Sequence, residues 1–163
     1  MRRSQRKQTQ PDLGVLASQV LFSVQDELYA RLDQQGHPTL RPRHGAVMAY
    51  LDAEGSRATA LAQQSGQHKQ VIGTLVDELV ELGYVRREPD PDDRRAKLIV
   101  PTPLGLDEMA KADAILAAIE QRHGQALGEA AYDHFKRAFQ QVAHAQRAWR
   151  DGERASRDGS HRG

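Results

Sequence analysis

The stretch YVRREPDPDDRRAKLIV, residues 84–100, decides how this chain is interpreted. Its two short apolar ends enclose five basic residues, four acidic residues and two prolines. A segment this charged cannot be core, and the prolines stiffen the turn at its centre. We therefore expect strands at Tyr84–Glu88 and Ala96–Val100, joined by a tip that holds Arg94 and Arg95 away from the domain.

The residues before this hairpin predict two helices joined by a turn. Thr59 is the expected N-cap of a short helix over ALAQQS, residues 60–65, which Gly66 ends. A longer helix is expected over KQVIGTLVDELVELG, residues 69–83, with Gly83 at its end in the C′ position. A short helix, a turn with glycine and a longer helix form the helix-turn-helix pattern, and a hairpin directly after it makes the winged variant.

The longer helix has one face for a core and another that suits DNA. Gln70 and Thr74 are four residues apart, so they stack on one side. Gly73 costs about 1 kcal/mol relative to Ala in a helix interior, but it permits close approach of a duplex. His68 and Lys69 stand at the helix N-terminus, where the dipole favours phosphate. The alternative is an ordinary solvated face. The expected buried face consists of Val71, Ile72, Leu75, Val76, Leu79 and Leu82.

The hairpin tip predicts a second contact with DNA. Narrow A·T-rich minor grooves concentrate negative potential and attract arginine. Side chains alternate along an extended chain, so we assign Arg95 to the groove and Asp93, two residues earlier, as the carboxylate that braces it. Arg94 then points the other way and can contact a phosphate. The alternative is a charged turn that neutralises itself, and this alternative is weaker directly after a helix-turn-helix.

Apolar residues recur at three- and four-residue steps on both sides of this motif. One stripe covers residues 13–35, and a second helical stretch is expected over residues 43–53. Two more helices are expected over residues 104–125 and 129–147. These stripes exceed what a small winged domain can cover, so we expect a second copy of the chain to cover them. Packing within one chain is the alternative.

The two ends of the chain are polar. Each is rich in basic residues and lacks an apolar stripe, so both are predicted to be disordered. The predicted fold is therefore mainly α. Its expected domains are a disordered basic arm (1–11), a dimerisation helix (12–36), a winged helix-turn-helix DNA-binding domain (37–102), dimerisation helices (103–147) and a disordered tail (148–163).

Composition argues against several other classes of protein. The chain has no cysteine, which excludes disulfides and thiolate sites, and its seven histidines lack the spacing of a zinc site. It has no phosphate loop or nucleophile elbow, so we expect neither an enzyme nor a cofactor. No apolar run is long enough for a membrane span or signal peptide, and a cytoplasmic protein is expected. With a net charge of only +1, an anionic partner must be met by a local basic patch.

Residues 40–105 resemble the multiple-antibiotic-resistance-regulator (MarR) family of winged helix-turn-helix regulators. The strongest likeness is DPDDRRAKLIVPTPLG, which is similar to the family's D-x-R wing motif, the strand after it and the Thr-x-x-Gly lead into the next helix. Many relatives carry an arginine in the recognition helix where this chain has Thr74. This difference leaves more of the contact to Lys69, Gln70 and the wing. The matching motif positions are Asp93, Arg95, Thr102 and Gly105.

The resemblance implies an obligate homodimer whose N-terminal helix and last two helices form the interface. It also implies one winged domain per subunit, which reads a palindromic operator, and a small-molecule switch where the dimer helices meet the winged domain. Arg41 and His44 could pair with an anionic aromatic ligand, and Phe22 and Met48 could form its apolar wall. The alternative is that these are helix-start and core residues. The implied effector residues are Phe22, Asp26, Tyr29, Arg41, His44 and Met48.

The expected function is therefore a sequence-specific regulator of transcription that binds double-stranded DNA, a repressor released by a small-molecule effector. The alternative is a winged-helix module that binds another protein and no DNA. Salt distinguishes the two, because the release of phosphate counterions makes DNA binding fall steeply as salt rises.

Overall fold

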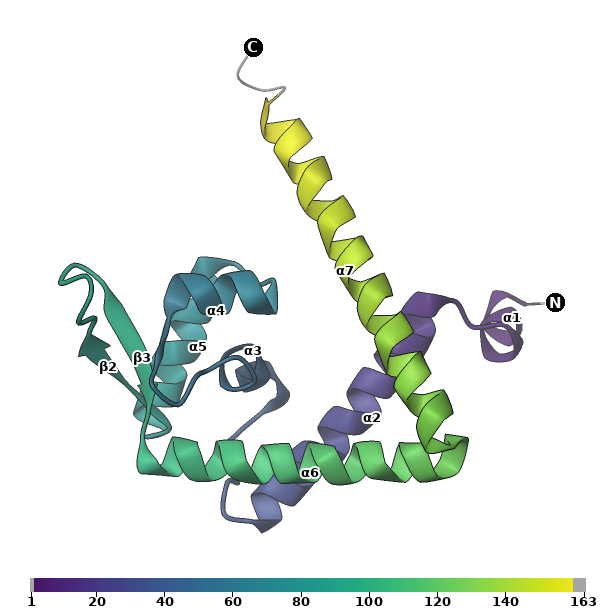
Figure 1. Cartoon of the computed structure of the whole chain (residues 1–163), viewed down its shortest axis with the longest axis horizontal. Coiled ribbons are helices and arrows are strands. Elements are labelled where there is room, and N and C mark those ends of the chain that lie inside the picture. The colour runs from purple at the N-terminus through teal and green to yellow at the C-terminus, as the bar shows by residue number, and fades with distance from the viewer. Residues whose placement is uncertain (1, 160–163) are drawn as a thin grey trace. The chain divides into compact units, whose positions relative to one another are not determined.

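The computed structural model describes the backbone of residues 2–159 and the side chains of residues 2 and 4–153. The chain divides into two compact units, residues 1–116 and 117–163, which are described separately. The predicted fold class is confirmed, since most of the described residues are helical and a small antiparallel sheet follows the longer helix of the pair (Figure 1).

The first unit begins with two helices, α1 (Arg3–Thr9) and α2 (Leu13–Gln34). Helix α1 corrects the prediction of a disordered arm at the start of the chain. Its serine, glutamine, arginine and lysine residues do not break a helix, and the last turn is tied down because Lys7 pairs with Asp12. The Asp12 carboxylate also caps α2 by accepting a hydrogen bond from the backbone N–H of Val15 at 3.0 Å.

The apolar stripe of α2 is largely uncovered within the single chain. Leu32, near its end, is the residue of this helix that is fully buried. The apolar side chains in its first half are about half exposed, which is far more than a core helix would leave to water. These exposed side chains are Leu13, Leu16, Val20, Leu21 and Phe22.

The winged domain follows in the same unit. Its sheet has the strand order β1-β3-β2 with antiparallel pairs, and the hairpin stands beside α4 and α5 (Figure 1). Its elements are a 3-10 turn η1 (Pro42–His44), α3 (Gly45–Met48), β1 (Ser56–Arg57), α4 (Ala58–Ser65), α5 (Lys69–Glu81), β2 (Val85–Pro89) and β3 (Lys97–Pro101).

Three boundaries in this domain differ from prediction. The helix expected over residues 43–53 is much shorter, because the chain turns after α3 to enter β1. Thr59 is not an N-cap, since Arg57 occupies that position at the end of β1 and makes no side-chain cap. The hairpin strands begin and end one residue later than expected. The two glycine stops are confirmed, with left-handed φ values of 72° at Gly66 and 81° at Gly83.

The core of the domain lies between the helices and the inner face of the sheet. Val71 departs from the predicted buried face of α5, because it is 41% exposed, whereas Ile72 and Val76 are fully covered. Leu82 is only partly buried and packs at the margin. The core comprises Leu40, Val47, Met48, Leu51, Leu61, Ile72, Leu75, Val76, Leu79, Tyr84, Val85 and Ile99.

The Thr-x-x-Gly sequence fastens the hairpin to the next helix. The hydroxyl of Thr102 donates to the carbonyl oxygen of Gly83 at 2.6 Å and accepts from the backbone N–H of Gly105 at 3.2 Å. The backbone N–H of Thr102 donates to the carbonyl oxygen of Tyr84 at 3.0 Å. A Cβ at Gly105 would overlap that same carbonyl oxygen, so only glycine fits here.

A buried histidine joins the end of α2 to the wing and to the following helix. The Nδ1 atom of His37 lies 3.0 Å from the hydroxyl of Tyr84, and its Nε2 lies 2.9 Å from a carboxylate oxygen of Asp107. Lys111 donates to the same oxygen at 2.6 Å and to the carbonyl oxygen of Gln35 at 2.8 Å. The hydrogen bond from Lys111, followed by that from His37, holds the pKa of Asp107 below its usual value.

The last two helices are α6 (Pro103–Leu127), which continues from the first unit into the second, and α7 (Glu129–Gly159). Gly128 between them has a φ of 92°. Helix α7 runs beyond the predicted end at Arg147 and corrects much of the expected disordered tail. Residues 148–159 include three arginines and two alanines, which favour a helix, and Gly152 in the helix interior is tolerated. The remaining predicted tail, residues 160–163, lies outside the described residues.

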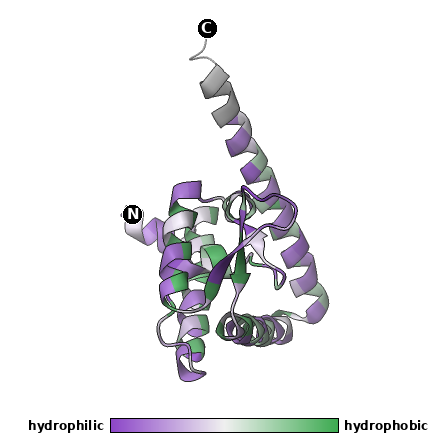
Figure 2. Cartoon of the chain, turned by 90° about the vertical axis from the view of Figure 1, so that its left-hand side faces the viewer, coloured by the Kyte–Doolittle hydropathy of each residue, from purple (hydrophilic) through white to green (hydrophobic). Residues whose placement is uncertain are grey.

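The coloured part of helix α7 carries both apolar and polar residues (Figure 2). Within the second unit, Lys136 pairs with Glu120 at 2.6 Å, and the rings of Phe135 and Phe139 stack 5.6 Å apart. Several large apolar side chains of α7 nevertheless remain exposed, namely Phe135, Phe139, Val142 and Trp149. None of the helices in residues 2–159 is long and apolar enough to cross a membrane.

Candidate nucleic-acid interface

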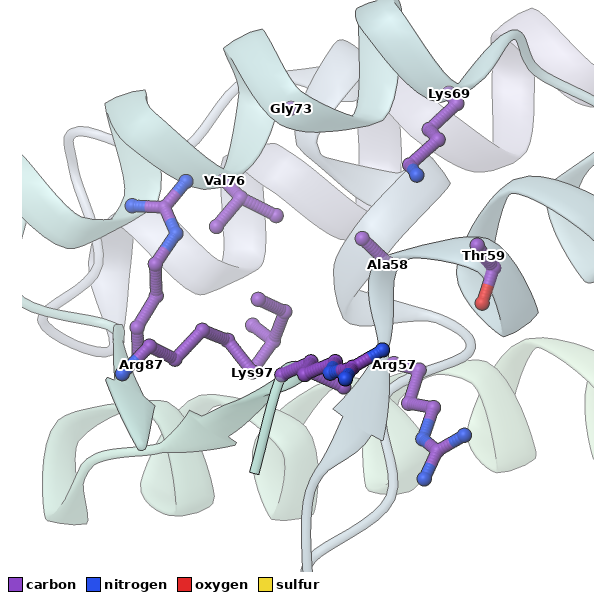
Figure 3. Close-up of a pocket in the computed structure, with 11 residues that line it drawn as sticks. Arg57, Ala58, Thr59, Lys69, Gly73, Val76, Arg87 and Lys97 are labelled. Atoms are coloured by element: carbon purple, nitrogen blue, oxygen red, sulfur yellow. The ribbon is translucent and has the colours of Figure 1, made fainter. Parts of the chain in front are cut away.

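A cleft of about 430 Å³ lies between α5, the start of α4 and the wing (Figure 3). Lys69 points from α5 toward the start of α4, and Arg87 reaches from β2 toward α5 (Figure 3). The cleft is lined by Arg57, Ala58, Thr59, Lys69, Gly73, Val76, Arg87, Arg95, Ala96, Lys97 and Ile99.

Positive charge gathers in this cleft. Its lining has no acidic residue and includes five cations, although the whole chain carries a net charge of only +1. Such a concentration is the local basic patch that an anionic partner requires. Each of the five cations comes from a different element or turn, and they are Arg57, Lys69, Arg87, Arg95 and Lys97.

The predicted recognition-helix residues lie on the exposed side of α5. Lys69 and Gly73 line the cleft, while His68, Gln70 and Thr74 are exposed next to it. A Cβ built on Gly73 would meet nothing within 4 Å, so packing does not require glycine at this position. The hydroxyl of Thr74 is used locally, because it donates to the carbonyl oxygen of Gln70 at 3.2 Å.

The wing tip is built differently from the prediction. Arg94 and Arg95 lie in a turn and not on an extended strand, so the argument from alternating side chains does not apply. The Asp93 carboxylate accepts from the backbone N–H of Arg95 at 3.0 Å and so braces the turn, not the guanidinium. All three side chains are exposed, and of the two arginines Arg95 is the one that lines the cleft.

Two of the cleft arginines are held by acidic partners that the sequence does not reveal. Arg57 binds the buried carboxylate of Asp90 at 2.5 Å, and Arg87 binds Asp77 of α5 at 2.6 Å. A backbone hydrogen bond from Asp92, together with Arg57, lowers the pKa of Asp90. Arg57 and Asp90 are 33 residues apart, and β1 has only two residues, so no periodic signal marks the pair.

Helix α5 is also fixed on the side toward η1. Glu78 accepts from Arg43 at 2.8 Å and lies 3.0 Å from Nε2 of His44. The hydrogen bond from Arg43, followed by that from His44, lowers the pKa of Glu78. Arg43 and His44 therefore hold one flank of the recognition helix, and Arg87 of the wing holds the other through Asp77. Together these contacts set the orientation of the helix.

The implied effector residues are spread between surface and core. Phe22 and Asp26 are exposed on α2, and Met48 belongs to the core. His44 is buried, and both of its ring nitrogens are occupied, by the backbone N–H of Arg41 and by the carboxylate described above. The guanidinium of Arg41 donates to two backbone carbonyl oxygens at 2.7 Å.

Tyr29 connects α2 to this part of the core. It packs against the core cluster, and a Cβ at Gly45 would lie 3.2 Å from its hydroxyl oxygen. Burial, followed by the nearby carboxyl of Glu108, raises the pKa of Tyr29 to about 12. Glu108 itself is buried, one of its oxygens has no hydrogen-bond partner among the described residues, and burial raises its pKa to about 7. The adjacent acidic residues Asp107 and Glu108 are typical of a helix surface, so the burial of Glu108 differs from what the sequence indicates.

Comparisons with known proteins agree with this geometry. A sequence model of the MarR family matches residues 39–96. None of the curated proteins compared with the chain matches it significantly.

Solved structures extend the likeness beyond the winged domain. The crystal structure of CouR from Rhodococcus jostii RHA1 bound to p-coumaroyl-CoA is 32% identical, has a TM-score of 0.66, and covers 81% of this chain and 92% of its own. A MarR-family transcriptional regulator from Rhodococcus sp. RHA1 is 31% identical, with a TM-score of 0.64 and the same coverage. A repressor named CouR, bound to a 23-mer DNA duplex, has a TM-score of 0.68 over 85% of this chain and 96% of its own, but at 23% identity it shows the fold alone.

These relatives are regulators of transcription and not enzymes. Both cover 81% of this chain, at an identity that shows common family. The chain belongs to the MarR family of DNA-binding transcriptional regulators.

Proposed function

We propose that the chain is a repressor that binds a palindromic operator as a homodimer and is released by a small-molecule effector. The basic cleft between α5 and the wing carries this proposal, because it concentrates five cations in a chain that is nearly neutral overall. Phosphate contacts supply most of the affinity of such proteins, and side chains on the recognition helix supply the choice of sequence.

In this proposal the two exposed elements have separate tasks. The first turns of α5 enter the major groove, where Lys69 contacts phosphate and Gln70 pairs with adenine. The methyl group of Thr74 touches a thymine methyl, and His68 contributes charge at the helix N-terminus. Arg95 enters the minor groove from the wing, with Arg94 on a phosphate and Asp93 holding the turn.

Homodimerisation is supported by the apolar surface that each unit leaves exposed. Helix α2 exposes a stripe in its first half, and α7 exposes aromatic side chains along one face. A second copy of the chain would bury both surfaces. A two-fold dimer also places two recognition helices roughly 34 Å apart, one turn of DNA, on a palindrome.

An aromatic, anionic effector is the class that the residues around α2 and η1 favour. Arg41 supplies charge, Phe22 and Met48 supply apolar surface, and Asp26, Tyr29 and His44 complete the proposed site. CouR, which is 32% identical to this chain, was crystallised with p-coumaroyl-CoA, a ligand that combines an aromatic ring with negative charge. Such a repressor acts in the cytoplasm, as the sequence predicts.

Fluorescence anisotropy with a labelled duplex from the gene's own upstream region tests the proposal. Specific binding should fall steeply between 50 and 200 mM salt, roughly 10³-fold or more if six phosphates are contacted. Addition of aromatic carboxylates or their CoA thioesters should then release the duplex. Binding that is absent, or indifferent to salt, would favour the alternative of a module that binds protein.

A further inference from the structure

Asp90 stands apart from the other residues of the wing tip because it is buried. Residues 91–95 are exposed, whereas Asp90 is 3% exposed. Burial of a carboxylate is costly unless its oxygens are hydrogen-bonded, so the partners of Asp90 show what it holds in place.

The two carboxylate oxygens of Asp90 bind different parts of the domain. Oδ1 accepts from the backbone N–H of Asp92 at 2.9 Å, and Oδ2 accepts from Nε and Nη2 of Arg57, each at 2.5 Å. The backbone N–H of Asp90 donates to the carbonyl oxygen of Ala96 at 3.1 Å, which closes the base of the loop. One side chain therefore fixes both the turn that carries Arg95 and a cation of another strand.

Arg57 connects this loop to the helix-turn-helix. It is the last residue of β1, pairs with Leu98 of β3 and occupies the N-cap position of α4. Arg57 is one of the residues that line the basic cleft, and its side chain is 44% exposed, although Oδ2 of Asp90 binds two of its nitrogens. A guanidinium has five N–H donors, so the pair leaves donors that can reach a phosphate oxygen.

From this geometry we propose that Asp90 is a positioning residue for DNA binding, which orients Arg57 toward a backbone phosphate and holds the wing turn in register with α5. The proposal rests on DNA binding at the cleft. In this proposal Arg57 contacts a backbone phosphate that lies between the major groove, which α5 enters, and the minor groove, which the wing enters. It also explains why a carboxylate is buried beside a surface that binds an anion.

The direction in which one substitution changes operator affinity distinguishes this role from a general effect of charge. Asp90→Asn removes a negative charge near DNA, so charge alone predicts tighter binding. If Asp90 orients Arg57, the same substitution weakens operator binding about tenfold, because the amide oxygen can still accept from the loop N–H but no longer fixes the guanidinium by charge. Asp92→Asn is the matched control, since Asp92 is exposed in the same turn and loses the same charge.

The experiment measures operator affinity by anisotropy at several salt concentrations for wild type, Asp90→Asn, Asp92→Asn, Arg57→Gln and the double variant Asp90→Asn/Arg57→Gln. Arg57→Gln should weaken binding about tenfold and reduce the salt slope by about 1, as expected when one phosphate contact is lost. The double variant should be no weaker than Arg57→Gln alone, because the two residues act through one contact.

Thermal unfolding of each variant keeps the proposal testable if Asp90→Asn folds poorly. In that case Arg57→Lys, with Asp90 intact, should retain charge but lose the two-nitrogen contact, and its affinity should fall between wild type and Arg57→Gln. Arg86→Gln controls for loss of a cation on the same sheet, since Arg86 of β2 does not line the cleft.

Three results would overturn the inference. In the first, Asp90→Asn binds the operator as tightly as Asp92→Asn. In the second, the fold-loss of affinity in the double variant equals the product of the losses in the two single variants. In the third, Arg57→Gln leaves the dependence of affinity on salt unchanged. If the wild-type protein itself binds no duplex, the proposed function fails, and this inference fails with it. If wild type binds with a steep salt slope and Asp90→Asn does not differ from its control, only this inference fails.

Discussion

Gly73→Ala should make the protein more stable and a poorer DNA binder. Gly73 lies in the interior of α5 without a positive φ, and a Cβ built on it meets nothing within 4 Å. No overlap opposes the better helix propensity of alanine, which is about 1 kcal/mol. For a chain of this size that corresponds to a rise in Tm of roughly 2–4 °C.

The same methyl group should obstruct DNA, because Gly73 lines the cleft. A methyl in the path of the duplex holds the helix away from the groove, and we expect a loss of affinity on the order of tenfold, comparable to the loss of one good contact. Differential scanning fluorimetry and anisotropy with the operator duplex measure the two effects on the same sample.

Gly152→Ala is the matched control for binding. It also lies inside a helix, α7, and a Cβ there meets nothing within 4 Å, but it is remote in sequence from the winged domain. It should leave operator affinity unchanged. If Gly73→Ala binds the operator as tightly as wild type, the backbone of α5 does not approach DNA at this position. If its Tm falls, the space beside Gly73 is not open.

Four further predictions concern other substitutions and two truncations. Gly105→Ala should destabilise the fold by about 1–3 kcal/mol in urea unfolding, because its Cβ would overlap a carbonyl oxygen of the backbone. Arg95→Ala should weaken operator binding strongly and Arg94→Ala less, as measured by anisotropy, since Arg95 lines the cleft; equal losses would contradict this. Burial raises the pKa of Glu108 from 4.5 to about 7, so the folded state disfavours the charged carboxylate. The free energy of unfolding of the wild type, measured in urea, should therefore decline as pH rises between those two values, and the contribution of this group to the decline should be absent in Glu108→Gln. Removal of residues 1–10 should leave a dimer by light scattering, while removal of residues 1–35 should give a monomer without specific binding.

The recognition helix and the hairpin could be predicted because their signals are local. Gly66 and Gly83 end helices through conformations that other residues adopt with difficulty, and the glycine φ values confirm both stops. The apolar spacing of α5 likewise places Ile72 and Val76 in the core. Such features need only a few neighbouring residues, so a single sequence is sufficient to find them.

The rest depends on contacts between distant residues or on a balance of small energies. Strand β1 has two residues and exists because Arg57 pairs with Leu98 across the sheet, which no local pattern indicates. The bond between Arg57 and Asp90 is hidden for the same reason. At the ends of the chain, a polar composition fits both a solvated helix and a disordered segment, and composition does not separate them without the contacts that the ends make.

The donor and the acceptor in each hydrogen bond of His37 can be assigned from its two partners. A carboxylate can only accept, so the imidazole nitrogen facing Asp107, Nε2, carries the proton, and in the neutral ring Nδ1 accepts from the hydroxyl of Tyr84. The tautomer of one ring is therefore set jointly by the start of the wing and by α6. Because the nitrogen chemical shifts of an imidazole differ between tautomers, a single labelled histidine reports whether the wing and α6 remain joined when DNA or an effector binds.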